Sequence, residues 1–214
     1  MAEEGCSHIA GCYYVALKPM PRRIDAEART AAIAEASLRV LERDGLSGLS
    51  VRGVAAETGI AAASLRRAFA TQHALREYCL QLIEDRVTAR VSALDLTGRA
   101  LVDELLLQLL PLDKERRMEL VAQVQLGVLS LTDSELVPAA IRLSNAVDRA
   151  CHAAVMILAE AGQFYSGRDP EYEARRLRAL LDGIAMQGLW SGELPESSEM
   201  PSMLARHLDE LAGP

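Results

Sequence analysis

The sequence predicts an all-α fold of about nine helices, and three observations lead to this prediction. Half of the 214 residues are hydrophobic, and most of these are alanine and leucine, which lose little rotamer freedom in a helix. Runs of β-branched residues are absent, so strands have little to build on. Between breaks marked by Pro and Gly, apolar residues recur at steps of three and four, which is the spacing of one helical face.

The first helix is expected over residues 25–44. Ile33, Val40 and their apolar neighbours follow the helical spacing. Asp25 is a residue type that caps helix N-termini, and Gly45 is the type that ends helices in a left-handed conformation.

Residues 50–69, "SVRGVAAETGIAAASLRRAF", look at first like one alanine-rich helix. A continuous helix would place Ile60 about 200° away from Thr58, on the opposite side from the apolar face. It would therefore expose either Ile60 or Leu65. Two shorter helices around a turn at Gly59 bury all of these apolar side chains, so we predict two helices here.

These two helices are expected over residues 51–58 and 62–69, in a helix-turn-helix arrangement. Ser50 can cap the first of them, and the small Ala55 lets the pair cross closely. The alternative, on geometry alone, is an ordinary αα-corner inside a helical core.

The rest of the chain also follows the helical spacing. Pro170 stands at the first helical position after Asp169, as is typical of a helix start. The further helices are expected over residues 71–94, 98–112, 113–133, 134–163, 169–190 and 198–213.

Charge is distributed unevenly along the chain. Residues 1–75 carry 9 Lys and Arg against 8 Asp and Glu, whereas residues 76–214 carry 14 against 22. A mildly basic front and an acidic remainder fit a small module that contacts an anion, joined to a larger body that does not touch nucleic acid.

Several function classes lack their usual signals. No run of about 18 apolar residues is present, so we expect no membrane span. The N-terminus carries acids where a signal peptide carries bases. The histidines are scattered, with no Ser–His–Asp set and no glycine-rich phosphate loop, so we expect neither an enzyme nor a cofactor. The four cysteines have no metal-ligand spacing and are expected to be reduced thiols of a cytoplasmic protein: Cys6, Cys12, Cys79 and Cys151.

The stretch around the predicted turn resembles the DNA-binding domain of the TetR family of transcriptional regulators. That family's usual pattern is a Gly after the first helix and then T-V-R-x-I-A-x-x-A-G-V-S-x-G-x-L-Y-x-H-F-x-S-K-x-x-L. The resemblance covers roughly residues 25–76 without gaps, and a second, weaker match lies in "LLDGIAMQGLW". The matching positions are Ser50, Val51, Arg52, Val54, Ala55, Gly59, Ile60, Leu65, Phe69, Thr71 and Leu75.

In a helix-turn-helix, the second helix lies in the major groove and its early residues meet base edges. Arg66 and Arg67 are the predicted main DNA contacts, because a guanidinium can bind guanine or phosphate. The other predicted DNA-binding residues lie next to them or at the starts of neighbouring helices: Ala62, Ala63, Ser50, Arg52, Thr71, Gln72, Arg22 and Arg23.

One departure from the family pattern affects the second helix directly. Ala61 stands where the family usually has a capping Ser. Its methyl group cannot accept a hydrogen bond, so the start of the helix is expected to lose about 1 kcal/mol of stabilisation.

The resemblance implies a ligand-responsive repressor that binds a palindromic operator in double-stranded DNA. It implies a DNA-binding domain over 21–71 and an effector-binding and dimerisation domain over 72–214. Residues 1–20, ahead of the first predicted helix, are expected on their sequence alone to be a flexible extension. An unknown small molecule would bind among the middle helices, where the candidate lining residues are Met118, Gln125, Asn145, His152, Met156 and Trp190.

A homodimer is expected through the last two helices, which would form a four-helix seam. The candidate seam residues are Leu177, Leu180, Leu181, Gly183, Ile184, Ala185, Gly188, Met203, Leu204, Leu208 and Leu211. The alternative is that these faces pack within their own subunit.

Two other functions remain open at this point. An all-helical protein–protein interaction module, with a reading head that has lost its DNA affinity, would fit the departures from the family pattern. A helical enzyme would need an organised polar constellation, which the sequence does not show.

Overall fold

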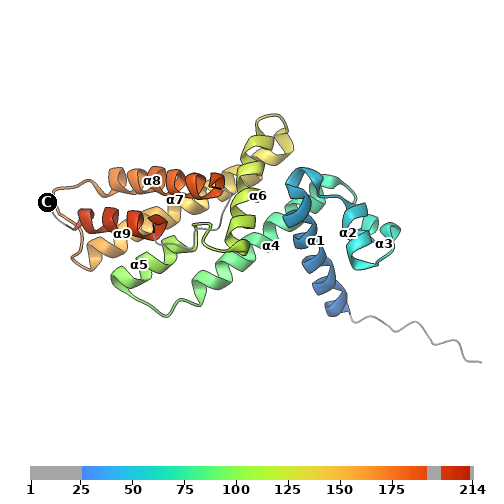
Figure 1. Cartoon of the computed structure of the whole chain (residues 1–214), viewed down its shortest axis with the longest axis horizontal. Helices are drawn as coiled ribbons and strands as arrows, with labels where there is room; N and C mark the ends of the chain where they lie inside the picture. The colour runs from blue at the N-terminus through green and yellow to red at the C-terminus, as the bar shows by residue number, and fades with distance from the viewer. Residues whose placement is uncertain (1–25, 192–198, 213–214) are drawn as a thin grey trace, which may run out of the picture.

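The computed structural model describes residues 26–191 and 199–212, and the folded segments in these ranges are all helical, which confirms the predicted fold class (Figure 1). The predicted extension over 1–20 and the predicted cap Asp25 lie outside the described residues. The elements are α1 (Ala26–Gly48), α2 (Val51–Thr58), α3 (Ala62–Ala68), α4 (Gln72–Ser92), α5 (Gly98–Leu107), α6 (Lys114–Ser130), the 3-10 turn η1 (Ser134–Leu136), α7 (Val137–Glu160), α8 (Pro170–Trp190) and α9 (Glu199–Leu211).

The helices form two groups that α4 and α6 connect (Figure 1). At one end, α1, α2 and α3 form a small group, which we call the head. At the other end, α5, α7, α8 and α9 lie roughly side by side as the body, with α7 packed most extensively on α8 and α5. Helix α4 runs from the head into the body, and α6 crosses between them while also packing on α1.

Most helix boundaries follow the capping residues that the sequence offers. The Oγ of Ser50 accepts from Gly53 N, and Gly59 ends α2 in the left-handed conformation. Thr71 caps α4 and Asp169 caps α8, each through its side chain. The predicted spans of α2 and α8 are therefore confirmed to within one residue.

Several predicted helix boundaries differ from the structure, among them those of α5, α6 and α7. Helix α5 ends at Leu107 instead of residue 112, because the residue before a proline is pushed out of the helical region and Pro111 follows closely. Helix α6 ends at Ser130, and the predicted helix over 134–163 begins as a 3-10 turn that Asp133 caps.

Helix α1 contains a break at the predicted stop. Gly45 has φ 69° and ψ −179°, and one further turn follows it up to Gly48. A residue with positive φ favours glycine, because a Cβ would approach the following carbonyl. The sequence therefore located the break, and the turn beyond it extends α1 past the predicted end at residue 44.

Buried apolar side chains form two clusters. The first joins the head to α4, the C-terminal half of α6 and the start of α7. The second lies in the body, among α5, α7, α8 and α9. Because the first cluster has members on both sides of residue 71, the head and α4 share one core; the division into 21–71 and 72–214 stays a prediction.

Most of the predicted seam residues pack inside their own chain. Leu177, Leu181 and Ile184 on α8 are at most 2% exposed, as are three leucines of α9. They belong to the body cluster, because α8 turns this face toward α7 and α9. Only a few candidate seam residues reach the surface, among them Gly183 and Met203.

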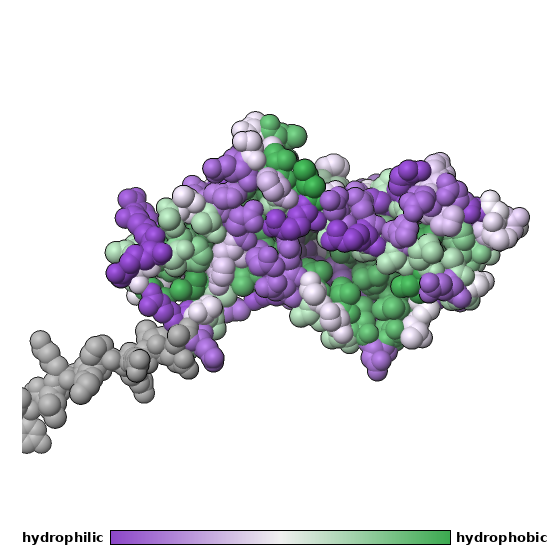
Figure 2. Space-filling view, turned by 180° about the vertical axis from the view of Figure 1, so that it is seen from behind, coloured by the Kyte–Doolittle hydropathy of each residue, from purple (hydrophilic) through white to green (hydrophobic). Residues whose placement is uncertain are grey.

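The α6–α7 hairpin projects from the rest of the molecule, and its tip exposes apolar side chains (Figure 2). Leu131 is 83% exposed and Val128 is 62% exposed. Ile141, near the start of α7, is also exposed.

Candidate nucleic-acid interface and ligand cavity

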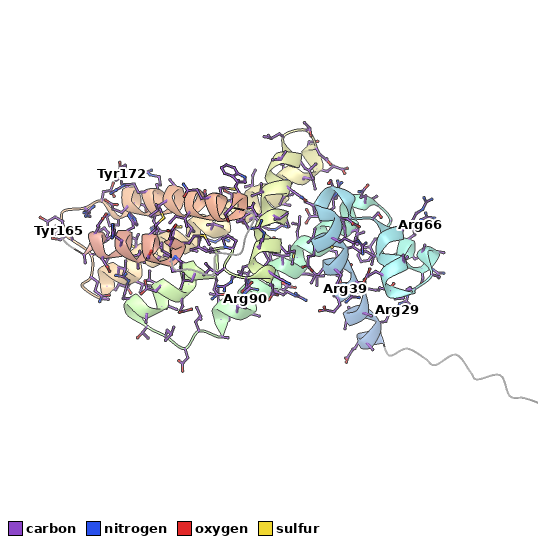
Figure 3. The ribbon with its side chains drawn as sticks, in the orientation of Figure 1. Arg29, Arg39, Arg66, Arg90, Tyr165 and Tyr172 are labelled. Carbon is purple, nitrogen blue, oxygen red and sulfur yellow. The ribbon has the colours of Figure 1, made fainter. Side chains whose placement is uncertain are left out.

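The reading helix α3 presents two arginines to solvent. Arg66 and Arg67 are both exposed, and neither has an ion pair within the described part of the chain. Arg66 projects away from the protein, at the opposite end of the molecule from Tyr165 and Tyr172 (Figure 3). Two adjacent guanidinium groups without a carboxylate partner are available to bind phosphate or base edges.

Other arginines of the head are neutralised by neighbouring carboxylates. Arg39 and Arg43 both bind Glu57, at 2.8 and 3.1 Å, and Arg43 also binds Asp44. Hydrogen bonds from the two arginines lower the pKa of the Glu57 carboxyl, so it stays ionised near neutral pH. Unlike Arg39 and Arg43, Arg66 and Arg67 have no carboxylate among the described residues to balance their charge.

Helix α3 begins without a side-chain cap, as predicted from Ala61. A contact from α1 holds it instead: the Nη2 of Arg29 donates to the Oγ of Ser64 at 2.6 Å. No local pattern in the sequence predicts this pair, because 35 residues separate its members. Arg29 thereby brings a third cation close to the reading helix.

The remaining predicted DNA residues divide into several groups. Arg52 and Ala63 are exposed, whereas Ala62 is half-buried against the first core. Ser50 and Thr71 use their hydroxyls as caps. Two arginines ahead of α1, Arg22 and Arg23, lie outside the described residues.

Gln72 has a hydrogen-bond partner inside the protein, and its predicted contact with DNA stays a prediction. Its Nε2 donates to the backbone oxygen of Leu49 at 3.1 Å. The amide thus ties the start of α4 to the loop before α2, although the side chain as a whole is exposed. Gln72 therefore helps to hold α2 and α3 in position through the backbone of Leu49.

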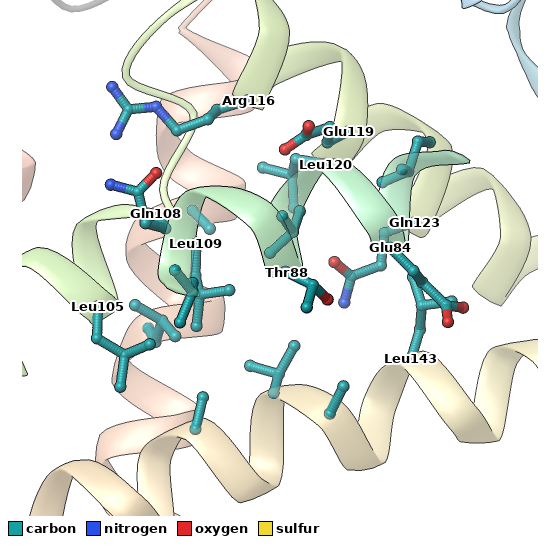
Figure 4. Close-up of a pocket in the computed structure, with 18 of the residues that line it drawn as sticks. Glu84, Thr88, Leu105, Gln108, Leu109, Arg116, Glu119, Leu120, Gln123 and Leu143 are labelled. Carbon is teal, nitrogen blue, oxygen red and sulfur yellow. The ribbon is translucent and has the colours of Figure 1, made fainter. Parts of the chain in front are cut away.

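A cavity of about 380 Å³ opens among α4, α5, α6, α7 and α8 (Figure 4). Its wall is mainly apolar, with Leu105, Leu109 and Leu143 among the lining residues. Thr88 of α4 and Gln123 of α6 point into it and supply uncharged polar groups. This wall suits a largely apolar small molecule that carries a hydrogen-bonding group.

An ion pair closes one side of this cavity. Glu119, only 8% exposed, binds Arg90 through both oxygens, at 2.9 and 2.6 Å. Arg90 also donates to Gln108 at 3.2 Å, so α4, α6 and the end of α5 are joined at one point. The hydrogen bonds that Arg90 donates to Glu119 raise the pKa of the Arg90 guanidinium, which stays charged.

Comparisons with known proteins agree with this arrangement. Residues 98–213, more than half of the chain, match the family model described as the C-terminal domain of BetI-type, TetR-class transcriptional repressors. The chain belongs to the TetR family. It is 26% identical, over 195 residues, to the HTH-type transcriptional regulator PksA of Bacillus subtilis (strain 168), covering 90% of this chain and 94% of PksA. The TetR-family protein described here is therefore a DNA-binding transcriptional regulator.

Solved structures share its fold. A transcriptional regulator from Saccharomonospora viridis, in complex with choline, superimposes with a TM-score of 0.70 at 23% identity, covering 87% of this chain and 97% of that one. The multidrug-binding protein EbrR, complexed with imidazole, matches with a TM-score of 0.57 at 30% identity, covering 88% and 94%.

None of the six ligand residues predicted for this TetR-family chain lines the cavity. Met118 packs against the first core, and the Gln125 amide binds the backbone of Leu46 in α1. Asn145, Met156 and Trp190 are exposed, with Trp190 at 74%. For Gln125 the reason is its position around the helix. Gln123 faces the cavity, whereas Gln125 lies about 200° further round α6.

His152 also has a different partner from the expected one. An ion pair with Asp148, four residues earlier, is the simplest prediction from the sequence. The structure instead places its Nε2 2.9 Å from Glu171 of α8, while Asp148 binds Arg178. Both pairs join α7 to α8 at the surface, beside a shallow charged cleft.

The two cysteines within the described residues are buried thiols. Burial raises the pKa of Cys79 and of Cys151 to about 12, so neither is a thiolate near neutral pH. Within residues 26–191 and 199–212, no three His, Cys, Asp or Glu side chains gather as a metal site would require. Across the same residues, every helix is too short or too polar to cross a membrane.

Proposed function

We propose that this TetR-family regulator is a repressor that binds a palindromic operator as a homodimer and is released by a small molecule in the cavity. The observation that carries the proposal is the path of α4. Thr71 caps this helix at the head, while Thr88 on the same helix lines the cavity. A ligand that shifts α4 therefore acts on the head through one continuous element.

Direct readout would rest on Arg66 and Arg67, supported by Arg52 and by Arg29. Each good bidentate contact of arginine to guanine contributes about 1–3 kcal/mol of discrimination. An operator selected from random oligonucleotides provides the substrate for the test. Replacing Arg66 and Arg67 together by Ala should then weaken binding about a hundredfold or more, because a dimer loses four such contacts.

The matched control removes the same charge elsewhere. Arg175→Ala with Arg206→Ala takes away two exposed cations of the body, on α8 and α9, and should leave operator affinity within about threefold, because these helices lie far from the head. Full operator affinity in the Arg66 and Arg67 double variant would refute the assignment of the reading residues. Failure of wild type to select any operator at low salt would refute the repressor proposal.

The dimer surface would be the exposed stripe of α8, together with Met203 of α9. This stripe comprises Tyr172, Ala179, Gly183 and Trp190, whose spacings of seven, four and seven residues lie on one helical face. It replaces the predicted seam residues that are buried in their own chain. A small residue at the centre permits close approach of the partner helix.

Gly183 allows a clean test of this surface. A Cβ at this position meets no atom within 4 Å, so the Gly183→Arg substitution should not prevent the subunit from folding. If α8 forms the seam, this variant should dissociate the dimer in analytical ultracentrifugation. Gly127→Arg, at an equally open position on α6, is the control and should remain dimeric. A dimeric Gly183→Arg variant would place the seam elsewhere.

The effector is expected to be a mainly apolar molecule that hydrogen-bonds Thr88 and Gln123. Relatives with bound choline or imidazole show that comparable folds hold small organic molecules. Screening for compounds that release the selected operator, followed by Gln123→Met, tests this site. The variant should raise the required concentration about tenfold, since one hydrogen bond to a neutral group is lost.

A further inference from the structure

The backbone of Leu46 is held from both sides by side chains that lie outside the head. Its N–H donates to the Oε1 of Gln125 on α6 at 2.5 Å. Its carbonyl accepts from the Nε of Arg76 on α4 at 3.2 Å. The helix α1 cannot supply the first of these bonds, because the break at Gly45 interrupts its own ladder.

The approach of Gln125 to this break requires the glycine. A Cβ on Gly45 would lie 2.6 Å from the Nε2 of Gln125 and 2.7 Å from its Oε1. The positive φ of Gly45 independently disfavours any other residue. The side-chain amide therefore packs directly on the open backbone of α1.

Gln125 also lies on the helix that lines the ligand cavity. Gln123, two residues earlier, points into that cavity from the other side of α6. A helix moves as a unit, so a ligand that rotates or shifts α6 at Gln123 displaces the Gln125 amide at Leu46. A hydrogen bond weakens steeply once its distance and angle leave a narrow range, so this contact responds to small movements.

The other links between the head and α6 are less directional. Arg86 bridges Glu35 of α1 and Glu115 of α6, but all three side chains are at least 35% exposed. Salt screens such pairs, and they tolerate a change of geometry. The hydrogen bond from Leu46 N–H to Gln125 is half-buried, and it requires a narrow range of distance and angle.

We propose that Gln125 is the positioning residue through which α6 sets the orientation of the reading head. It touches neither DNA nor effector. The Gln125 amide holds the α1 break in place when the cavity is empty and releases it when α6 moves. This inference rests on the proposed ligand response, and the following experiment separates the two.

Filling the cavity by mutation avoids the need for the effector. Ala146 lines the cavity and its side chain is exposed there, so Ala146→Trp places an indole in the space; Ala150→Trp is a second filling variant. Each is combined with Gln125→Met, which has similar length and no acceptor, and with Gln125→Glu, which keeps an acceptor oxygen. Gln123→Met is the matched control on the cavity side.

Affinity for the selected operator is measured for every combination. In the Gln125 background, filling the cavity should weaken binding between about fivefold and 150-fold, the usual range of allosteric coupling. With Gln125→Met the same filling should change affinity less than about twofold, and Gln125→Glu should restore the response. Hydrogen exchange at the Leu46 amide should accelerate in the filled variants and in Gln125→Met.

Two results would overturn the inference, and they differ. If filling weakens operator binding equally with Gln125 and with Met, the ligand response stands and Gln125 is not its link. If neither filling variant changes operator affinity in any background, the proposed ligand response fails together with the inference. A response that Gln123→Met abolishes as fully as Gln125→Met would also count against a specific role of Gln125.

Discussion

The two helices of the DNA-reading unit have nearly equal length and are stabilised in opposite ways. Helix α2 carries its own start and stop signals: the Ser50 hydroxyl at its N-terminus and Gly59 in the left-handed conformation at its C-terminus. Helix α3 has Ala61 and Phe69 at these places, without a side-chain cap. Leu65, which is fully buried, anchors it to the core, and Arg29 binds it from α1.

This difference shows how a regulator separates positioning from reading. Local sequence specifies both ends of the positioning helix α2, while Val54 in the first core and the ion pairs of Glu57 with α1 hold it in place. The reading helix α3 depends on tertiary contacts, so its orientation follows whatever moves α1 and the first core. Four substitutions test whether local signals stabilise α2 and tertiary contacts stabilise α3, beginning with the one that should change stability most.

Removal of the α3 anchor should have the largest effect. Leu65→Ala is expected to lower the free energy of unfolding by about 2–5 kcal/mol, as for other fully buried leucines. Urea unfolding followed by circular dichroism measures the change. Leu131→Ala, at a side chain that is 83% exposed, is the control and should change stability little. A cost below 1 kcal/mol at Leu65 would mean that α3 does not depend on this anchor.

The stop signal of α2 should rank second. Gly59→Ala should cost about 1–2 kcal/mol, because φ is 70° at this residue while an added Cβ meets no atom. Gly127→Ala, at an equally open position inside α6, should instead stabilise the protein by about 0.5–1 kcal/mol. Thermal unfolding of the two variants distinguishes conformational strain from steric contact; equal shifts would contradict the assignment.

The start signal of α2 comes next. Ser50→Ala removes the oxygen that accepts from Gly53 N and should cost about 1 kcal/mol. Hydrogen exchange should become faster in the first turn of α2, with little change in α3. Uniform acceleration over both helices would show that α2 is not locally stabilised.

The smallest effect is expected from supplying α3 with the cap that it lacks. Ala61→Ser should stabilise the protein by about 0.5–1 kcal/mol and slow exchange at the first amides of α3. Ala63→Ser, inside the helix and exposed, serves as the control and should give no gain. If Ala61→Ser has no effect, the tertiary contacts already satisfy the start of α3.

Local chemistry explains why much of the fold could be predicted. Ser50, Gly59, Thr71 and Asp169 act through neighbours within four residues, so the sequence alone reveals the helix ends they define. Helical spacing also indicates which residues share a face. The break at Gly45 belongs to the same class, because a positive φ is a property of the residue itself.

The cavity could not be predicted in the same way. Spacing shows that Gln123 and Gln125 lie on different faces of α6, but only the packing of α1 and α7 decides which face meets the ligand space. The sequence suggests Trp190 as a residue that lines the ligand pocket, yet it lies at the end of α8 and is exposed to solvent. The contact between Arg29 and Ser64 likewise forms only because two segments that are far apart in the sequence pack together.

The shared first core has a practical consequence for protein engineering. Leu75 and Leu80 of α4 and Leu126 of α6 pack in the same cluster as the side chains of the head. A fragment that stops at residue 71 would leave this cluster open to water and the Leu46 peptide groups unpaired. A chimaera that transplants the DNA specificity of this protein onto another sensor therefore has to carry α4 and the matching face of α6 along with the head.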